Sequence, residues 1–313
     1  MRLVGATVVR DAADIIEPFV RHNLTLLDQM AIVDHGSCDG TSEILAALAA
    51  ERLPISVARS DTPALHLSRP MNRLVRHVFS RTDAEWVFPL DADEFLKVES
   101  REELVATCAA IPPDGHLVLP WLTYVPRFDA GADVLPQLRS ARRVAQQRHG
   151  FEKVAVGRAF ANAAGQRLGK GYHAVEGEPP SSGVNAGVKS SAGGPALAHV
   201  PIRSARQFIA KFATGWLSAV ASGTLQGGEA FHWREAFAHL RAGRPVDKLQ
   251  LEAFALNYGV PRERWLPSTE IELLDDPFLA DIELRYSQLK LDDPLAIVLN
   301  VAERLLARPP AQG

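Results

Sequence analysis

Short apolar runs alternate with amphipathic stretches along the first third of the chain. The apolar runs have the length of strands, and they lie at residues 3–9, 31–33, 53–58 and 86–90. The stretches between them carry apolar residues at helical spacing, at residues 18–30, 41–49 and 70–79. Strands that alternate with helices indicate βαβ units with right-handed crossovers. The pattern therefore predicts an α/β fold, with a mainly parallel sheet flanked by helices.

The pattern loosens after residue 96. A helix is expected at residues 101–110, and strands are expected at 116–125 and 151–160. Residues 174–198 are rich in Gly, Ser and Pro, and this composition predicts a mobile loop between His173 and His199. A capping box at residues 204–207 begins an amphipathic helix, and helical patterns continue toward the C-terminus. We therefore divide the chain into an α/β domain, residues 1–203, and a mainly helical extension, residues 204–313.

Composition narrows the classes of protein to consider. With 313 residues, 47% of them hydrophobic, the chain can bury a sizeable core. A net charge of −3 gives no basic footprint for nucleic acid. Cys38 and Cys108 lack the spacing of a disulfide scaffold or a zinc site. Without an apolar stretch of about 18 residues or a signal-peptide pattern, a cytoplasmic protein is expected, with peripheral membrane contact left open.

Three acids follow the apolar run at residues 86–90, which makes this stretch the strongest candidate for a site. Asp91, Asp93 and Glu94 come at the carboxyl end of a predicted strand, where open α/β sheets bind ligands. Alternation along an extended chain would point Asp91 and Asp93 to the same side. Paired carboxylates repel each other unless a cation joins them, and a divalent ion that holds a diphosphate suits them. The alternative is a solvated turn or a helix cap.

A second polar segment follows the predicted strand at residues 31–33. Asp34 and His35 begin a glycine-containing loop that leads directly into a helix. Such loops suit the close approach of a ligand. Asp39, near the end of the loop, has the alternative role of capping the following helix.

Several of these motifs, taken together, resemble glycosyltransferase family 2. The resemblance rests on V-D-H-G-S-C-D-G-T at residues 33–41, the segment 69–73 and W-V-F-P-L-D-A-D-E-F-L at residues 86–96. The later pieces H-V-P-I-R-S at residues 199–204 and F-I-A-K-F-A-T-G at residues 208–215 are similar to downstream elements of the branch with a D-A-D-E-F signature. The likeness covers roughly residues 1–220.

The resemblance implies a GT-A-type, Rossmann-like fold and a nucleotide-diphosphate sugar as donor. It also implies Mn²⁺ or Mg²⁺ at the D-x-D, where the ion would neutralise the departing diphosphate. Asp93 is the expected direct ligand and the central catalytic residue. Asp91 is expected to complete the metal site by facing the ribose or a metal-bound water.

The same resemblance places the nucleoside between the exit of the first strand and the Asp34 loop. Arg10, Asp34 and His35 are the residues expected to hold it, and Asp34 can accept from a base N–H or a ribose hydroxyl. A UDP-sugar is the first donor to consider. The base stays open because Arg10-Asp11-Ala12 replaces the common Asn-Glu of the family, and because His35 stands where an acid or Asn is frequent.

Basic residues and histidines are assigned to the diphosphate and the metal. Arg69 and Arg73, four residues apart, would share a helix face and reach the diphosphate, although a solvated helix face is the alternative. Arg203 is expected to clamp phosphate. Lys211 is expected either to join it there or to lie in solvent. The resemblance assigns His199 to the metal shell, with His173 as the substitute, because neutral imidazole binds manganese-like ions.

Inverting transfer needs a general base to take the proton of the acceptor hydroxyl. Glu152 is the candidate that we choose by its position after the D-x-D, ahead of Asp129, His149 and Glu176; an ordinary exposed acid is the alternative. Trp121 and Tyr124 are expected to stack on a sugar or to lie in the core.

These observations together predict a metal-dependent, hexosyltransferase-like enzyme. Its acceptor would be a glycan, a lipid-linked sugar or a protein. Two alternatives are kept. One is a non-catalytic module that binds a nucleotide or glycan. The other is a D-x-D phosphoryl-transfer enzyme, but Phe95 argues against it because it occupies a position where such enzymes usually have Thr or Val.

Overall fold

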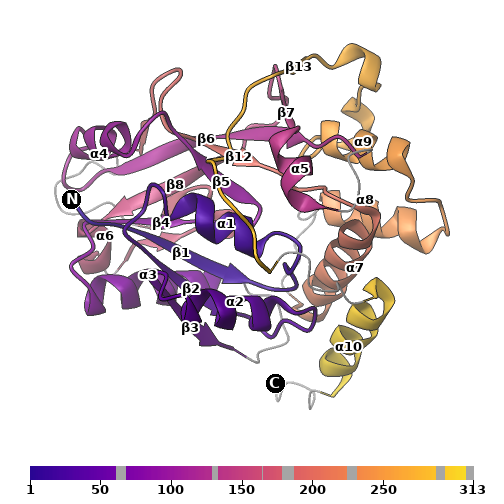
Figure 1. The fold of residues 1–313 in the computed structure, drawn as a ribbon, viewed down its shortest axis with the longest axis horizontal. Coiled ribbons are helices and arrows are strands. Elements are labelled where there is room, and N and C mark those ends of the chain that lie inside the picture. Colours follow the sequence, from indigo (N-terminus) through magenta and orange to yellow (C-terminus); the bar gives the residue numbers. More distant parts are fainter. Residues whose placement is uncertain are drawn as a thin grey trace.

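The computed structural model describes residues 1–60, 68–128, 133–163, 165–177, 187–223, 231–286 and 293–307. A curled central sheet with helices on both faces forms the body of the molecule, and the helices of the C-terminal third gather at one end of it (Figure 1). The predicted α/β class, with a mainly parallel sheet and a helical C-terminal region, is confirmed.

The strands of the main sheet follow the order β13-β7-β6-β8-β4-β1-β2-β3; β11 and β12 also pair with β6, and β5 pairs with β12. The pairings among β3, β2, β1 and β4 are parallel, and β8 then runs antiparallel to β4 and β6. The strand bounds are β1 Leu3–Val9, β2 Gln29–Asp34, β3 Ile55–Arg59, β4 Trp86–Pro89, β5 Glu94–Lys97, β6 His116–Val125, β7 Arg142–Val144, β8 Glu152–Gly157, β11 Gly187–Lys189, β12 Ala196–His199 and β13 Leu273–Leu274. A separate pair consists of β9 Arg167–Leu168 and β10 Val175–Glu176.

Alternate side chains of the parallel strands pack against different helices. Val4 and Ala6 of β1 join the apolar cluster of α3, whereas Leu3 and Val9 join that of α1 and α2. The helix bounds are α1 Ile16–Asn23, α2 Thr41–Ala50, α3 Ser68–Arg81, α4 Arg101–Ala109, α5 Val134–Arg139, α6 Ala159–Asn162, α7 Ala205–Ala221, α8 Phe231–Arg241, α9 Lys248–Leu256 and α10 Pro294–Leu306. Because β1, β2 and β4 are covered on both sides, they read as nearly continuous apolar runs, whereas the edge strand β3 is mostly exposed.

Two expectations about local structure need correction. The stretch 174–198 is not one loop, because β10, β11 and β12 lie within it. The strand β12 pairs antiparallel with β5 and parallel with β6, so it is bound on both sides. The helix predicted to continue to Met30 ends at Asn23, since Gln29 already begins β2. Small and apolar residues in 195–198 gain their partners from distant strands, which a local composition argument cannot see.

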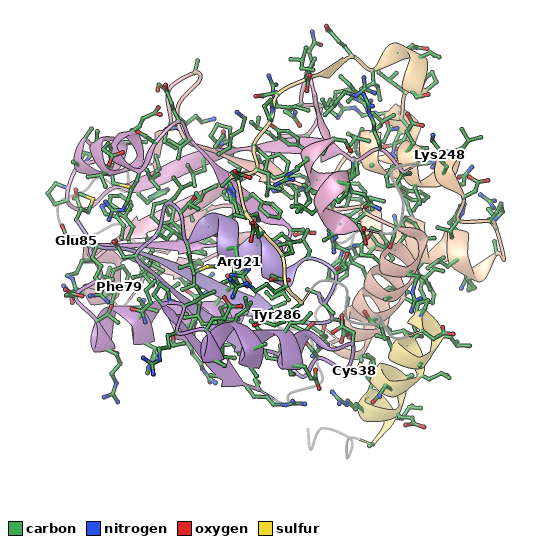
Figure 2. All side chains as sticks on the ribbon, viewed as in Figure 1. Arg21, Cys38, Phe79, Glu85, Lys248 and Tyr286 are labelled. Carbon is green, nitrogen blue, oxygen red and sulfur yellow. The ribbon has the colours of Figure 1, made fainter. Side chains whose placement is uncertain are left out.

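The C-terminal region folds back over the α/β part. The backbone N–H groups of Arg285 and Tyr286 both donate to the buried carboxylate of Glu17 on α1, at 2.7 Å each. Arg21 donates to Glu17 and Glu51 and lies beside the ring of Tyr286 (Figure 2). The division at residue 203 stays a prediction. Among the described residues, no helix has the length and apolar character needed to cross a membrane.

Candidate functional site

The D-x-D lies in a turn between two buried strands. The strand β4 ends at Pro89 and β5 begins at Glu94. The N–H of Glu94 donates to the carbonyl of Asp91 at 3.0 Å, and the carboxylate of Glu94 accepts from the N–H of Asp91 at 2.9 Å. These bonds close a turn where an extended segment was expected. Asp91 and Asp93 therefore contact different partners.

Three cationic or titratable side chains from the C-terminal half surround Asp93. Its Oδ2 accepts from Nζ of Lys211 at 2.6 Å, and Nε2 of His199 lies 3.6 Å from the same oxygen. A guanidinium nitrogen of Arg203 is 3.8 Å away. Burial raises the pKa of Asp93, but Lys211, His199 and Arg203 outweigh burial and hold the pKa well below its usual value. The residue is thus a carboxylate at neutral pH.

A buried lysine on β8 contacts the other two acids. Nζ of Lys153 lies 2.6 Å from Oδ2 of Asp91 and 2.9 Å from Oε1 of Glu94, and its side chain is only 1% exposed. Burial lowers the pKa of Lys153, but Asp91 and Glu94 outweigh it and leave the pKa raised. Burial also raises the pKa of Glu94. Two ammonium groups and the guanidinium of Arg203 thus face the three acids at the end of the strand.

His199 sits at the end of β12, directly beside the D-x-D. The pairing of β12 with β5 places His199 opposite Glu94, and its pairing with β6 places it opposite Thr123. Its ring stacks on the indole of Trp121, with 3.9 Å between centroids. Burial lowers the pKa of His199 to about 4 against the raising effect of Asp93. The imidazole is therefore neutral at physiological pH, as a metal ligand must be.

More histidines lie around Trp121 and His199. His149 and His173 meet the indole edge to face at 5.2 and 5.8 Å, and Tyr258 links His199 with His232. Burial lowers the pKa of His149 to about 4 and that of His232 to about 3. The side of the site formed by these rings is uncharged and aromatic.

This aromatic side contains polar atoms that have no hydrogen-bond partner in the described part of the chain. They are Nε1 of Trp121 and the Nδ1 atoms of His199 and His232. Buried polar atoms are nearly always paired in folded proteins. Three exceptions in one contiguous cluster fit a place where a polar ligand or water supplies the missing bonds.

The Asp34 loop satisfies its carboxylates from within its own neighbourhood. Asp34 ends β2 and accepts from the N–H of Ser37 at 2.9 Å and from the hydroxyl of Ser42. Asp39 accepts from the N–H groups of Ala13 and Thr41 at 2.9 and 3.1 Å. The cap residue of α2 is Gly40, so Asp39 supports the helix start from one position earlier. Burial raises the pKa of Asp39 to about 6, with Asp11 adding to the effect.

Arg10 and His35 lie together, as the sequence reasoning requires. The guanidinium of Arg10 donates to the carbonyl of His35 at 2.8 Å and contacts Nδ1 of the same residue at 2.8 Å. It also reaches the hydroxyl of Ser218 on α7 at 3.3 Å. Arg304 on α10 donates to the carbonyl of Gly36 at 2.7 Å. Two C-terminal helices thus hold the loop that is expected to bind the nucleoside.

The predicted phosphate contacts separate into two groups. Arg69 and Arg73 are exposed on α3. Arg203 is buried, and it makes a two-point ion pair with Asp14 at 2.6 and 3.0 Å and donates to the carbonyl of Val200. Because its guanidinium is already bonded on both sides, Arg203 is better described as an anchor beside Asp93 than as a free phosphate clamp.

The candidate base Glu152 points away from the D-x-D. Its carboxylate pairs with Lys189 on β11 at 2.7 Å, and Lys189 is mostly exposed. The neighbouring residue, Lys153, reaches Asp91, and adjacent side chains of a strand point to opposite faces. The structure therefore does not support Glu152 as the base, because the alternation of side chains along β8 turns its carboxylate away from the face on which Lys153 meets Asp91. Asp129, a further candidate, lies outside the described residues, and the carboxylate of Glu176 pairs with Arg167.

Asp93 and His199 are the described residues whose donor atoms could hold a divalent ion, in competition with Lys211, which bonds Oδ2 of Asp93. A carboxylate oxygen and a neutral imidazole nitrogen lie 3.6 Å apart, a separation that an ion with ligand bonds of about 2.0–2.2 Å can bridge. Among the described residues, no group of three or more His, Cys, Asp or Glu side chains is arranged around one such point. An ion held by Asp93 and His199 would therefore complete its shell with water and substrate oxygens, as Mg²⁺ commonly does. His173, the substitute ligand, stays a prediction: its Nδ1 bonds the carbonyl of Glu152 at 2.6 Å, which leaves Nε2 as the nitrogen that could face an ion.

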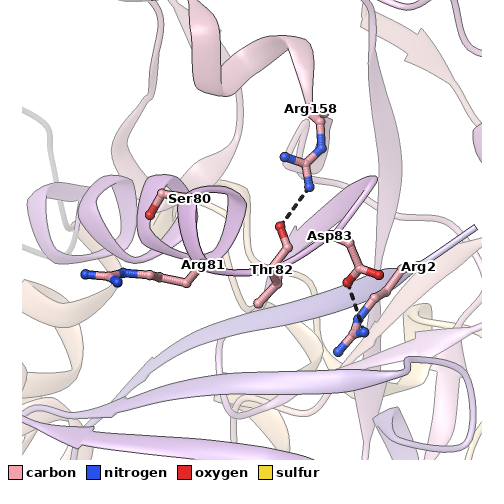
Figure 3. A pocket seen from close by; sticks show the side chains of 6 residues that line it. All are labelled: Arg2, Ser80, Arg81, Thr82, Asp83 and Arg158. Carbon is pink, nitrogen blue, oxygen red and sulfur yellow. Dashed lines mark hydrogen bonds and ion pairs between the residues drawn. The ribbon is translucent and has the colours of Figure 1, made fainter.

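A separate basic pocket of about 680 Å³ lies at the opposite edge of the sheet (Figure 3). It is lined by Arg2, which precedes β1, by residues 80–83 before β4, and by Arg158 after β8. Arg2 pairs with Asp83 at 2.9 Å, and Arg158 donates to the carbonyls of Phe79 and Thr82. The charged groups of Arg2 and Arg158 therefore already bond other parts of the fold. The pocket lies at the amino ends of β1 and β4, away from the D-x-D.

The sequence reasoning missed Lys153, although a signal was present. Lys153 stands in F-E-K-V-A-V-G, next to a run of apolar residues that was correctly predicted as a strand. A lysine that faces the apolar side of a buried strand must have an acidic partner. His232 had no comparable signal, because its contacts come from α8 reaching across to Tyr258.

Comparisons with known proteins agree with part of this picture. The model of the family "Glycosyl transferase family 2" matches residues 7–132, which include the Asp34 loop and the D-x-D. No curated protein matches the chain. Among solved structures, it is similar to S. aureus TarS 1-349, with 13% identity over 83% of each chain and a TM-score of 0.40. The same protein in complex with UDP-GlcNAc gives 14% identity over 84% of this chain and 74% of the other, with a TM-score of 0.41.

A mannosyltransferase, PcManGT from Pyrobaculum calidifontis in complex with GDP-Man and Mn²⁺, gives 17% identity over 81% of this chain and 72% of the other, with a TM-score of 0.40. Structural likeness of this degree supports no statement about activity. The family match is the informative finding, and it ends before Lys153, His199 and Lys211. The part of the site contributed by the second half of the chain is thus known only from its geometry.

Proposed function

We propose that the protein is a glycosyltransferase that moves a sugar, a hexose in the first instance, from a nucleoside-diphosphate sugar to an acceptor hydroxyl. The observation that carries this proposal is the meeting of the D-x-D with Lys211 and neutral His199 at one edge of the sheet. The family match over residues 7–132 supports the same class of reaction. A GT-A-type arrangement of donor and metal is part of the proposal.

The chain's own residues divide the work of binding the donor. The loop of Asp34, His35 and Arg10 would hold the nucleoside, because it follows a strand adjacent to β1 and offers buried acceptors and a guanidinium. Asp91 would face the ribose, and Lys211 would stand beside the diphosphate. Asp93 and His199 would hold Mn²⁺ or Mg²⁺, which when bound supplies Lewis-acid neutralisation of the departing diphosphate. UDP-sugars remain the first donors to test.

The acceptor side is proposed to be the aromatic and histidine cluster. His173 replaces Glu152 as our candidate for the general base of an inverting reaction. Its Nδ1 bonds the carbonyl of Glu152 at 2.6 Å, which assigns the proton to that nitrogen and the lone pair to Nε2. A sugar hydroxyl is an acceptor that such a neutral, aromatic surface accommodates. A glycan, a lipid-linked sugar and a glycosylated protein all present one.

Thermal unfolding of the purified protein with nucleotides tests the proposal. UDP, GDP and their sugars would be added with Mn²⁺, with Mg²⁺ or with EDTA. A ligand at one hundred times its dissociation constant stabilises the folded state by about 2.7 kcal/mol, a shift of several degrees in Tm. We expect stabilisation by one nucleotide family, and only with metal.

Two other outcomes would favour the alternatives. Metal-dependent binding with no sugar transfer or donor hydrolysis would favour a binding module. Formation of a phosphorylated protein would favour phosphoryl transfer with Asp91 as nucleophile. Absence of binding by all the nucleotides would overturn the proposal.

A further inference from the structure

Lys153 is buried in a place where a lysine is costly. Its side chain is 1% exposed and projects from the middle of the sheet, on the strand that lies between β4 and β6. Removing an ammonium group from water costs several kcal/mol unless partners repay it. Here the partners are Asp91 and Glu94, at 2.6 and 2.9 Å.

The ring of Tyr172 also contacts the ammonium of Lys153. Nζ of Lys153 lies 4.8 Å from the ring centroid of buried Tyr172, which is a cation–π distance. Tyr172 has a φ of 59°, and Gly171 before it has a φ of 62°. A tyrosine in this left-handed conformation is strained. The chain thus accepts strain in residues 171–172 while it presents this ring to the lysine.

The two acids that Lys153 contacts differ in their access to solvent. Glu94 is fully buried, whereas the side chain of Asp91 is 34% exposed. Only Oδ2 of Asp91 contacts the ammonium at 2.6 Å. One oxygen of Asp91 is thereby fixed, and the carboxylate as a whole still reaches the surface of the site.

We propose that Lys153 is a positioning residue for the donor: its ammonium takes up the charge of Glu94 and fixes the carboxylate of Asp91 toward the nucleoside diphosphate. This inference rests on the proposed function. Lys153 itself touches no substrate. Its effect on the donor passes entirely through Asp91.

The competing explanation is that Lys153 only stabilises the fold. Variants of Glu94 can distinguish this role from a positioning role. Lys153→Met alone would leave Glu94 buried without a cation and would destabilise the fold whatever the role of the lysine. Lys153→Met with Glu94→Gln removes both charges together, and a buried ion pair can often be replaced at little cost in stability. Glu94→Gln alone is the matched control, because it keeps the contact between Lys153 and Asp91.

The experiment measures the affinity for UDP and GDP, with Mn²⁺, by titration calorimetry, and Tm by thermal unfolding. We expect Glu94→Gln to bind within about three-fold of the wild type. The double variant should bind at least about ten-fold more weakly at a Tm close to that of the control. Adding Asp91→Asn to the double variant should cost little more, because residues that act as a unit are not additive.

Equal affinities of the control and the double variant would overturn the positioning role and leave Lys153 as part of the fold alone. So would a full additional loss on adding Asp91→Asn, since Asp91 would then act independently of Lys153. Failure of the wild type and of Glu94→Gln to bind either nucleotide would instead count against the proposed function. The two failures are therefore distinguishable.

Discussion

The Asp34 loop and the D-x-D are both acidic and both lie at the carboxyl ends of strands, but their carboxylates are satisfied in opposite ways. Asp34 and Asp39 accept from backbone N–H groups and hydroxyls within about thirty residues along the chain. Asp91 and Asp93 pair with Lys153 and Lys211, which lie 62 and 118 residues away. The carboxylates of the first region bond nearby segments of the chain, although Arg304 also bonds the loop from α10, whereas the acids of the second region pair with lysines from distant strands and helices.

The two regions differ in the kind of interaction that holds their acids. The carboxylates of the Asp34 loop are bonded by backbone N–H groups and hydroxyls rather than by ammonium groups. The acids of the D-x-D are held by ion pairs, and ammonium and carboxylate groups interact strongly away from water. A bound donor or metal could exchange partners with these charged groups. Substitutions in the two regions should therefore differ in whether they change stability or affinity.

The largest expected effect is on stability, from Lys153→Met. The substitution leaves Glu94 buried without its cation, and breaking a buried pair costs about 3–5 kcal/mol. The matched control is Lys189→Met, which breaks the exposed pair with Glu152 and should cost at most about 1 kcal/mol. Urea unfolding measures both. Similar costs for the two variants would show that the charges at the D-x-D are less isolated from water than the structure indicates.

The next effect is on affinity, from Asp93→Asn. We expect metal-dependent binding of the donor nucleotide to weaken by at least about 100-fold, or about 2.7 kcal/mol, because one of the two proposed metal ligands is weakened. The fold should persist, since Lys211 can reach solvent and Arg203 keeps Asp14. Calorimetry with Mn²⁺ measures the change, and the exposed Asp281→Asn is the control. Unchanged metal and nucleotide binding would remove Asp93 from the site.

Arg304→Ala tests whether the Asp34 loop is as independent as its local bonds suggest. Its guanidinium bonds the carbonyl of Gly36 at 2.7 Å, and a hydrogen bond to a charged group contributes about 1.5–3 kcal/mol. We expect a loss of stability near the lower limit and a several-fold weaker binding of nucleotide. Arg241→Ala, an exposed arginine at the end of α8, is the control. If Arg304→Ala leaves both quantities unchanged, the loop holds itself without α10.

A pH titration tests the support of the D-x-D from α1. Nε2 of His22 donates to the carbonyl of Leu96 on β5, and Nδ1 accepts from Ala280. Burial lowers the pKa of His22 to about 4. Its contribution to stability is therefore complete above about pH 6.5 and is lost as the pH falls toward 4, because the unfolded chain takes up a proton that the folded chain does not.

His22→Gln should therefore flatten the loss of stability between pH 6.5 and 4 by about 1.4 kcal/mol per pH unit. Chemical unfolding at pH 7, 6 and 5 gives the slope. His77→Gln on the exposed face of α3 is the control and should leave the slope unchanged. An unchanged slope in His22→Gln would mean that this histidine titrates in the folded state as it does in the unfolded chain.

The smallest effect is expected from Arg69→Ala and Arg73→Ala. Both side chains are exposed on α3, and a solvated charge near a diphosphate contributes about 1 kcal/mol or less. Each variant should weaken nucleotide binding by a few-fold, more at low salt than at high salt. Calorimetry at two ionic strengths measures this. A loss larger than that of Asp93→Asn would show that α3 approaches the donor directly.

The sequence by itself determined the parallel part of the sheet and the place of the acids. Buried strands and amphipathic helices have distinct periods, so β1, β2, β4 and the helices between them could be read from the order of apolar residues. The rule that ligands bind at the carboxyl ends of parallel strands then brought Asp34 and Asp91 to one edge. Both inferences need only local pattern and the twist and handedness of βαβ units.

The partners of these acids were decided by the tertiary structure alone. Lys153 and His199 reach the D-x-D because β8 and β12 join the sheet through antiparallel and mixed pairings, whose register no local pattern specifies. One residue of shift along β8 would have exchanged Lys153 for Glu152 at Asp91. Charge pairing in a buried site depends on which face a side chain takes, and that choice is fixed only when the strands pair.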